Sequence, residues 1–143
     1  MQVYVFDARL EADTRIRRRI ALRADQKLTD LHAALQEAYE WADDHLYAFW
    51  LSGRFWDRQS REYTIPFELE PHQRSAATRL SRLGLERGQK IAYLFDFGDE
   101  WRVVLTVASI EAADDGRYPR VLERQGDAPP QYPDYEEELI EAD

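Results

Sequence analysis

The sequence predicts a single α+β domain in which one main helix packs on a mixed or antiparallel sheet of about five to six strands. Apolar residues alternate in several short runs, as in strands, and one segment repeats them at helical spacing. The expected order of elements is β-β-α-β-β-α-β-β. A chain of 143 residues with 44% hydrophobic residues is long enough to form one core. We expect a core domain over residues 1–125 and a proline-containing acidic C-terminal arm over residues 126–143.

The first two segments are expected to pair as a hairpin. Residues 1–6 are mainly apolar, and a turn at 11–13 separates them from an arginine-rich run that ends at Arg23. Since alternate side chains of a strand share a face, one face of the second strand would carry a row of arginines. They are Arg15, Arg17, Arg19 and Arg23. This face is either a solvated or edge strand whose charges discourage aggregation, or a surface that binds phosphate or an acidic peptide.

A helix is predicted from about Leu28 to Tyr39, because apolar residues recur there at intervals of three and four. Thr29 is the expected N-cap, and Asp30 is favourably placed in the first turn. His32 flanks the apolar stripe, where the helix dipole disfavours a proton. It is therefore either a packing histidine, a ligand or a neutral base.

The remaining elements follow from runs of apolar residues and from turn signals. An acidic connector at 41–45 leads into a central strand over 45–51, and a further hairpin arm precedes Pro66. A short helix is expected to begin near Ser75 and to end near Gly84. Strands at 90–95 and 101–110 then flank a tight turn. After Gly116 the composition shifts to Arg, Gly, Pro and acids, which predicts an extended arm.

Composition limits the classes of function. The chain has no cysteine, which excludes disulfides, thiolate metal sites and cysteine nucleophiles. The formal net charge is −9, but six acids lie in the last ten residues, so the rest carries only −3. No signal segment or membrane-length apolar run is evident, which predicts a cytoplasmic protein without membrane contact. Phosphate-loop, serine-triad and kinase motifs are also missing from the sequence.

The most informative motif is the turn between the strands at 90–95 and 101–110. Gly98 can adopt a positive φ, and Asp96 and Asp99 can bond nearby amides, which is ordinary hairpin chemistry. Alternatively, the two carboxylates are hard oxygen ligands for Mg²⁺ or Mn²⁺. That alternative requires the turn to meet the segment around the helix in space. The further candidate ligands are Asp43, Asp44, His45 and His32.

The residues that carry a family resemblance are Asp30, Leu31, His32, Trp41, Asp43, His45, Leu46, Phe49, Tyr93, Asp96, Phe97, Gly98, Asp99 and Trp101, followed by Tyr118, Pro119, Pro129 and Pro130. On these residues the chain resembles the Ri plasmid ORF-3-like family over most of its length. Members of that family occur on plasmids, in insertion-element and other mobile-element contexts, and as chromosomal genes. The resemblance implies no established biochemical activity. The chain departs from the family pattern with Glu40 for a glycine, Arg17 for a tryptophan, and Gln131 and Tyr132 for an acidic pair.

We therefore expect a non-catalytic binding module that presents the arginine face to an acidic or nucleic-acid partner and needs no cofactor. The alternative is a divalent-metal-dependent hydrolase that uses Asp96 and Asp99. A third possibility is a structural or regulatory partner of a neighbouring gene product. The acidic tail at 134–143 is either a solubilising terminus or a segment that folds back on the arginine face and competes with the partner, an interaction that salt would screen.

Overall fold

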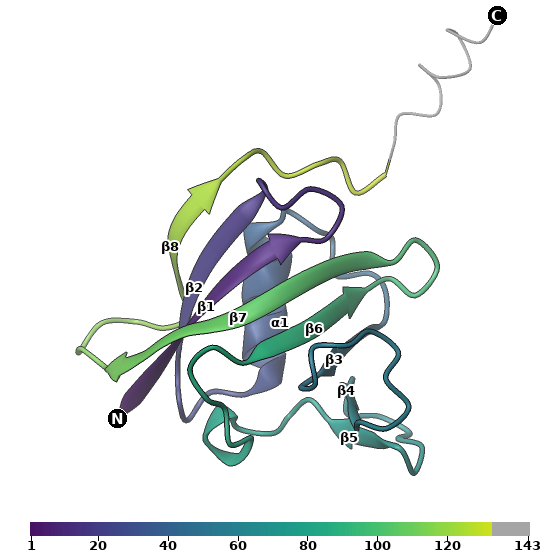
Figure 1. The fold of residues 1–143 in the computed structure, drawn as a ribbon, viewed down its shortest axis with the longest axis horizontal. Helices are drawn as coiled ribbons and strands as arrows, with labels where there is room; N and C mark the ends of the chain where they lie inside the picture. The colour runs from purple at the N-terminus through teal and green to yellow at the C-terminus, as the bar shows by residue number, and fades with distance from the viewer. Residues whose placement is uncertain (133–143) are drawn as a thin grey trace, which may run out of the picture.

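In the part of the chain that the structure describes, one mixed sheet of eight strands carries a single α-helix on one face. The computed structural model describes residues 1–132 (Figure 1). The elements are β1 (Gln2–Leu10), β2 (Arg17–Arg23), α1 (Leu28–Ala38), β3 (Tyr47–Trp50), β4 (Glu62–Thr64), β5 (Gln73–Ser75), the 3₁₀ turn η1 (Leu80–Arg82), β6 (Lys90–Phe95), β7 (Trp101–Ala112) and β8 (Arg120–Gln125). The strands are ordered β5-β4-β3-β6-β7-β1-β2-β8. Neighbours are antiparallel, except that β4 and β5 run parallel.

The expected sheet of five to six strands in the order β-β-α-β-β-α-β-β is wrong. The predicted second helix is replaced by the end of β5 and the turn η1. Ala76 and Leu80 have helical spacing, but their amides bond the distant carbonyls of Thr64 and Gln26. These tertiary hydrogen bonds outweigh the local preference for a helix. The class of fold nevertheless remains α+β, with one main helix packed on the sheet.

The sequence does not predict strand β8, because four of its six residues are exposed. Only Val121 of this strand packs against the core, so the alternation of apolar and polar residues that identifies a strand is missing. β8 pairs with β2, which is therefore an interior strand and not the edge strand that the sequence suggested. Among the described residues, no helix combines the length and the apolar character that a membrane crossing requires.

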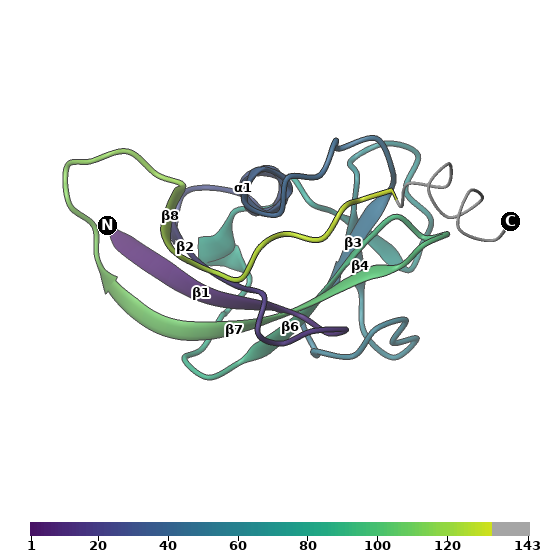
Figure 2. The same cartoon turned by 90° about the horizontal axis from the view of Figure 1, so that it is seen from above.

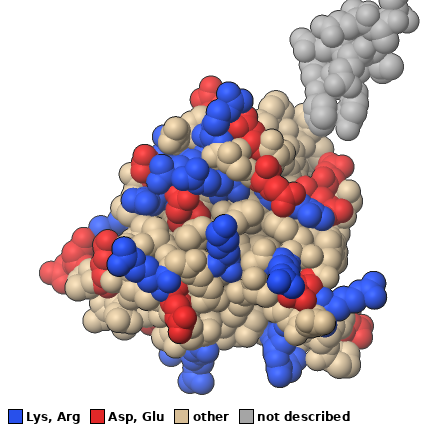
Figure 3. All heavy atoms as spheres, viewed as in Figure 1, with Lys and Arg blue, Asp and Glu red and all other residues tan. Residues whose placement is uncertain are grey.

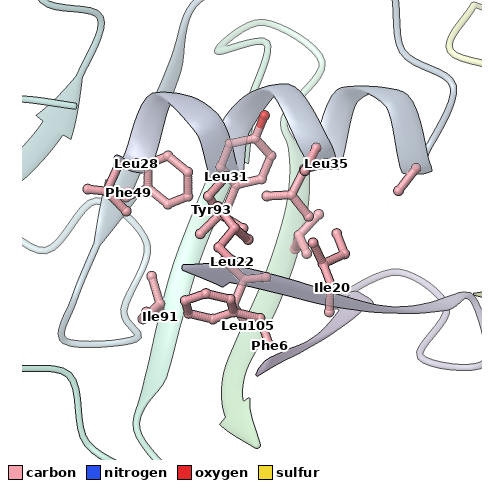
Figure 4. Packing of buried hydrophobic residues seen from close by; sticks show 14 of the residues in the cluster. Phe6, Ile20, Leu22, Leu28, Leu31, Leu35, Phe49, Ile91, Tyr93 and Leu105 are labelled. Carbon is pink, nitrogen blue, oxygen red and sulfur yellow. The ribbon is translucent and has the colours of Figure 1, made fainter. Parts of the chain in front are cut away.

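The helix lies on one side of the sheet, as Figure 2 shows. Leu28, Leu31 and Leu35 are fully buried and point from α1 toward the side chains of the central strands, including Phe49 and Tyr93 (Figure 4). The helix begins after Lys27 and not at the predicted Thr29. The Asp30 carboxylate accepts a hydrogen bond from the Lys27 amide at 2.8 Å, which satisfies a donor that the helix leaves free.

The C-terminal end of α1 is a left-handed turn at Glu40. The Trp41 amide bonds the Gln36 carbonyl at 2.9 Å, and the Glu40 amide bonds the Glu37 carbonyl at 3.2 Å. This pair of bonds is the Schellman motif, in which the residue at the position of Glu40 is usually glycine. Glu40 has φ of 60°. The positive φ at this position explains why the family pattern has glycine there.

We expect Glu40→Gly to raise the free energy of unfolding by about 1 kcal/mol, because glycine adopts a positive φ without the steric penalty of a side chain. Urea unfolding followed by circular dichroism measures this change. The control is Glu37→Gly, at an exposed position inside the same helix. That change should lower stability by about 1 kcal/mol. Loss of stability in both variants would contradict our account of Glu40.

Candidate functional site

The sheet face opposite α1 carries a groove. Two apolar clusters occupy other parts of this face: one is centred on Val3, Val5 and Ala21, and the other on Trp50 and Ala92. Between them lies a shallow groove of about 550 Å³. It is lined by Asp7, Arg9, Leu10, Glu11, Thr14, Arg17, Arg19, Lys90, Val104, Thr106 and Ala108. We call this feature the cationic groove.

Strand register brings the charged groups of the cationic groove together from four strands. One row across β6, β7, β1 and β2 consists of Lys90, Thr106, Asp7 and Arg19. The next row consists of Ala92, Val104, Arg9 and Arg17. Neighbouring strands are about 4.8 Å apart, so the cations extend across about 14 Å of sheet.

Asp7 holds two of the arginines in place. Its carboxylate accepts hydrogen bonds from Arg9 Nε at 2.9 Å and from Arg17 Nε. Partial burial by itself raises the pKa of Asp7, but the hydrogen bonds from these arginines outweigh it and bring the pKa below its usual value. Asp7 therefore stays charged and orients both guanidinium groups. Arg19 Nε is buried without a hydrogen-bond partner among the described residues.

The cationic groove is positive on a negative protein. Four bases and two acids line it, whereas the whole chain has a formal charge of −9. Figure 3 shows Lys and Arg atoms gathered over the upper parts of β1 and β2, with acidic atoms beside them. The side chains between the cations, at Val104, Thr106 and Ala108, are small or medium in size. An anionic chain can therefore approach the sheet closely.

The predicted arginine face is divided by the structure. Arg17 and Arg19 line the cationic groove. Arg15 is highly exposed and pairs with Asp13, and Arg23 pairs with Asp25. Sequence reasoning missed two members of the groove, Arg9 and Lys90. Arg9 is two residues after Asp7, so the alternation of a strand would have predicted it on the same face. Lys90, in contrast, joins the groove only through the pairing of β6 with β7.

Arg18 lies on the other side of the sheet from its neighbours. It is buried, and its guanidinium group donates to the carbonyls of Ala38 at 2.9 Å and Gln125 at 3.0 Å. Ala38 ends α1, so the cation also lies at the negative end of the helix dipole. The side chain thus joins β2 to the helix and to the end of β8, from the face of β2 that also carries the buried Ile20 and Leu22.

The two segments of the predicted metal site do meet. His45 Nε2 lies 3.4 Å from Asp96 Oδ2, and His32 Nε2 lies 2.7 Å from Asp43 Oδ1. However, among the described residues no group of three or more histidine, aspartate and glutamate side chains is placed to hold a metal ion. Binding of Mg²⁺ or Mn²⁺ therefore stays a prediction.

Asp96 stabilises the backbone of the tight turn. Its Oδ1 accepts the amides of Gly98 at 3.0 Å and Asp99 at 3.2 Å, as hairpin chemistry predicts. Within this turn, the backbone angle φ is positive at Asp96 (64°) and Glu100 (52°). It is not positive at Gly98, where the sequence suggested it. Left-handed residues other than glycine often occur at sites with a specific geometric task.

His32 belongs to a closed ring of hydrogen bonds. Its Nδ1 lies 2.7 Å from the hydroxyl of Tyr93, to which Gln36 Nε2 donates at 3.0 Å. Gln36 Oε1 in turn accepts the amide of Asp43 at 2.9 Å, and Asp43 Oδ1 bonds His32 Nε2. Burial lowers the pKa of His32, although Asp43 opposes this shift. With a neutral His32 that carries its proton on Nε2, every donor in the ring meets an acceptor.

This buried neutral histidine makes stability depend on pH. As the pH falls below about 6.5, the unfolded chain takes up a proton at His32 that the folded protein resists, so stability falls. We expect the melting temperature to decrease between about pH 7.5 and pH 5.5, and to decrease less in His32→Gln. The control is His72→Gln, at an exposed histidine, which should keep the wild-type slope. Equal slopes in wild type and His32→Gln would contradict this role.

The segment after β8 returns to the acidic connector. Tyr132 lies with its hydroxyl 2.8 Å from Asp44 Oδ2 and 2.7 Å from His45 Nε2. Gln131 donates to Asp44 Oδ1 at 2.9 Å and accepts the amide of Ala42 at 2.7 Å. Gln131 and Tyr132, which stand in place of the acidic pair of the family pattern, thus form the contact of this segment with the connector. The acidic tail at 134–143, with its predicted competition for the arginine face, lies outside the described residues.

The fold and the groove define an α+β protein with one helix on a mixed eight-stranded sheet and a cationic groove on the opposite face. The chain belongs to the plasmid pRiA4b ORF-3-like protein family, whose model matches residues 2–137. The family resemblance inferred from the motif residues is thereby confirmed.

Two similar proteins extend this comparison. The chain is 29% identical over 119 residues to the uncharacterized protein y4hQ of Sinorhizobium fredii (strain NBRC 101917 / NGR234). The match covers 81% of this chain but only 58% of the length of that relative. The crystal structure of a protein of unknown function, MM3350 from Methanosarcina mazei Go1, superposes with a TM-score of 0.77 at 25% identity. This structural match covers 97% of this chain and 80% of the chain of MM3350. Neither name states an activity.

Proposed function

We propose that this protein is a non-catalytic binding module whose cationic groove holds the phosphate backbone of a single-stranded nucleic acid. The observation that carries the proposal is the convergence of Arg9, Arg17, Arg19 and Lys90 on a sheet face that the helix leaves open. Guanidinium groups match phosphate oxygens with paired, charge-assisted hydrogen bonds. A groove with a net positive lining attracts such a partner despite the negative charge of the whole chain.

The shape of the cationic groove favours a single strand. It is a shallow depression between two apolar clusters that cover other parts of the same face. A flexible single strand can follow such a floor and place successive phosphates on cations that extend across about 14 Å of the sheet, from β6 to β2. A duplex presents its phosphates on a broad rigid cylinder, which reaches fewer of these cations at once.

Fluorescence anisotropy of labelled single- and double-stranded DNA tests the proposal. We expect the single strand to bind more tightly, and its affinity to fall at least about tenfold between about 50 and 200 mM salt. Arg17→Glu and Arg19→Glu should each weaken binding about tenfold or more. The control is Arg15→Glu, which changes net charge equally but lies outside the groove. Deletion of residues 134–143, which removes six acids, should tighten binding if the tail competes for the groove.

Three outcomes would overturn the proposal. The first is failure of wild-type and tail-deleted protein to bind either DNA. The second is an equal loss in Arg15→Glu and Arg17→Glu, which would mean that net charge and not the groove attracts the probe. The third is displacement of the DNA by poly-glutamate at an equal concentration of charges. That result would identify the groove as a surface for an acidic protein.

A further inference from the structure

Trp56 is an exposed aromatic residue on a strained backbone. It has φ of 57°, a conformation that is rare for a bulky residue, and 43% of its surface is exposed. A large apolar side chain that is both strained and half exposed has no obvious value for folding. Such an outlier points to a functional constraint on the position of the side chain.

The indole ring of Trp56 is held by the tight turn. Its Nε1 donates to Glu100 Oε1 at 3.1 Å, and its ring lies 5.2 Å from the ring of Phe97 in an edge-on arrangement. The ring of Trp50 lies 5.3 Å from the Trp56 ring in a tilted arrangement. Phe97 and Glu100 both belong to the turn that the sequence singled out. One task of that turn is therefore to fix the Trp56 ring before any ligand arrives.

Trp56 and the cationic groove lie on the same side of the sheet. Strand pairing places Trp50 in the row that continues through Ala92 and Val104 to Arg9 and Arg17. Four strand spacings separate Trp50 from Arg17, which is about 19 Å.

The loop that carries Trp56 also reaches the edge of the groove. A Cβ atom on Gly53 would lie 3.0 Å from the carbonyl oxygen of Lys90, and Lys90 lines the groove. A few nucleotides therefore suffice to connect the groove with Trp56.

Beside Trp56 is a pocket whose lining offers the aromatic surface and the hydrogen-bond acceptors that suit a nucleobase. Its volume is about 490 Å³, and its lining includes Trp50, Trp56, Asp57, Arg58, Ser60 and Glu62. The indole rings offer aromatic surface for stacking. The carboxylates of Asp57 and Glu62 offset the charge of Arg58 in this lining and are acceptors for the exocyclic amino groups of adenine, cytosine or guanine. Phosphate and base thus have separate places on one face of the sheet.

We infer that Trp56 is a stacking platform for a base of the strand whose phosphates lie in the cationic groove. This inference rests on the proposed function and adds the class of ligand: a single strand with unpaired bases, preferably with amino groups. Stacking on an aromatic side chain adds affinity with little dependence on sequence. The adjacent carboxylates favour oligo(dA) over oligo(dT).

Anisotropy with two labelled probes of equal length and charge tests the inference: oligo(dA), and an abasic phosphodiester oligomer. Wild type should bind oligo(dA) about tenfold more tightly than the abasic oligomer. Trp56→Ala should remove that difference and leave abasic binding unchanged, and Trp56→Phe should restore part of it. Arg17→Glu should weaken both probes. Thermal unfolding establishes that each variant is folded.

The result separates the two proposals. If wild type and Trp56→Ala bind both probes equally, and Arg17→Glu weakens both, then the groove binds phosphate and the platform is disproved. If Trp56→Ala weakens both probes by the same factor, Trp56 supports the fold of the groove and does not hold a base. If neither probe binds wild type, both proposals fail.

Discussion

Arg18→Met is expected to lower the free energy of unfolding by about 3 kcal/mol, a large fraction of the stability of a small domain. Methionine retains the apolar part of the side chain, but it removes the hydrogen bonds to the carbonyls of Ala38 and Gln125. The Gln125 carbonyl then lacks the partner that Arg18 supplies. The Ala38 carbonyl retains the hydrogen bond from Arg124 Nη1 at 3.1 Å. Urea unfolding measures the loss.

The neighbouring arginine is the matched control for this experiment. Arg19→Met changes the same side chain one position away, but on the face of the cationic groove. Because Arg19 Nε has no hydrogen-bond partner among the described residues, stability should change by less than about 0.5 kcal/mol. Affinity for single-stranded DNA should fall in Arg19→Met and persist in folded Arg18→Met. Similar stability losses in the two variants would contradict the division of β2 into a structural and a binding face.

Tyr93→Phe is expected to lower the free energy of unfolding by about 2 kcal/mol. The lost hydroxyl accepts from Gln36 Nε2 and bonds His32 Nδ1, and Tyr93 is fully buried. Both partners would then keep a buried polar atom without a hydrogen bond, which destabilises more than the bond itself contributes. Thermal or urea unfolding followed by circular dichroism measures the effect. Asp43 is held by the ring of hydrogen bonds around His32. The amides of the acidic connector should therefore also exchange their hydrogens faster in Tyr93→Phe.

Tyr4→Phe provides the comparison for Tyr93→Phe. Tyr4 is buried on β1, but its hydroxyl lies outside the ring of hydrogen bonds around His32. Removal of that hydroxyl should therefore change stability by less than about 0.5 kcal/mol. If both variants lose the same small amount, the ring around His32 contributes no more than ordinary packing.

The parts of this fold that sequence predicts are those with a strong local pattern. Leu31 and Leu35 repeat at helical spacing, and the helix is present. The alternation of Arg17, Arg18 and Arg19 predicts that Arg18 points away from its neighbours, which is confirmed. β5 has three residues, all half-buried, and β8 is mostly exposed, so neither gives a clear period. Their existence depends on partners that lie far away in the chain.

The candidate site was predictable to a similar extent. Arg17 and Arg19 are visible in the sequence, but the register that adds Lys90 is a property of the folded sheet. The contact between His45 and Asp96 was proposed from motif residues and is present, yet sequence alone does not show which atoms they use. Trp56 is one of the aromatic residues that suggest a hairpin arm before Pro66, but the sequence gives no sign of a binding role, because the distinguishing feature of Trp56 is a backbone angle.

The position of β1 in the sheet has a consequence for how the chain folds. β1 lies between β2, its neighbour in sequence, and β7, with pairs that run from Leu10–Val103 to Gln2–Ala112. During synthesis the first hairpin emerges early, but the strand that completes its pairing is made much later. Sheets closed by such distant contacts fold slowly, because a long loop must be ordered before the pairing stabilises it. Nascent chains that stop before β7 therefore expose the unpaired edge of β1 that faces away from β2, so the sheet is complete only after β7 has been made.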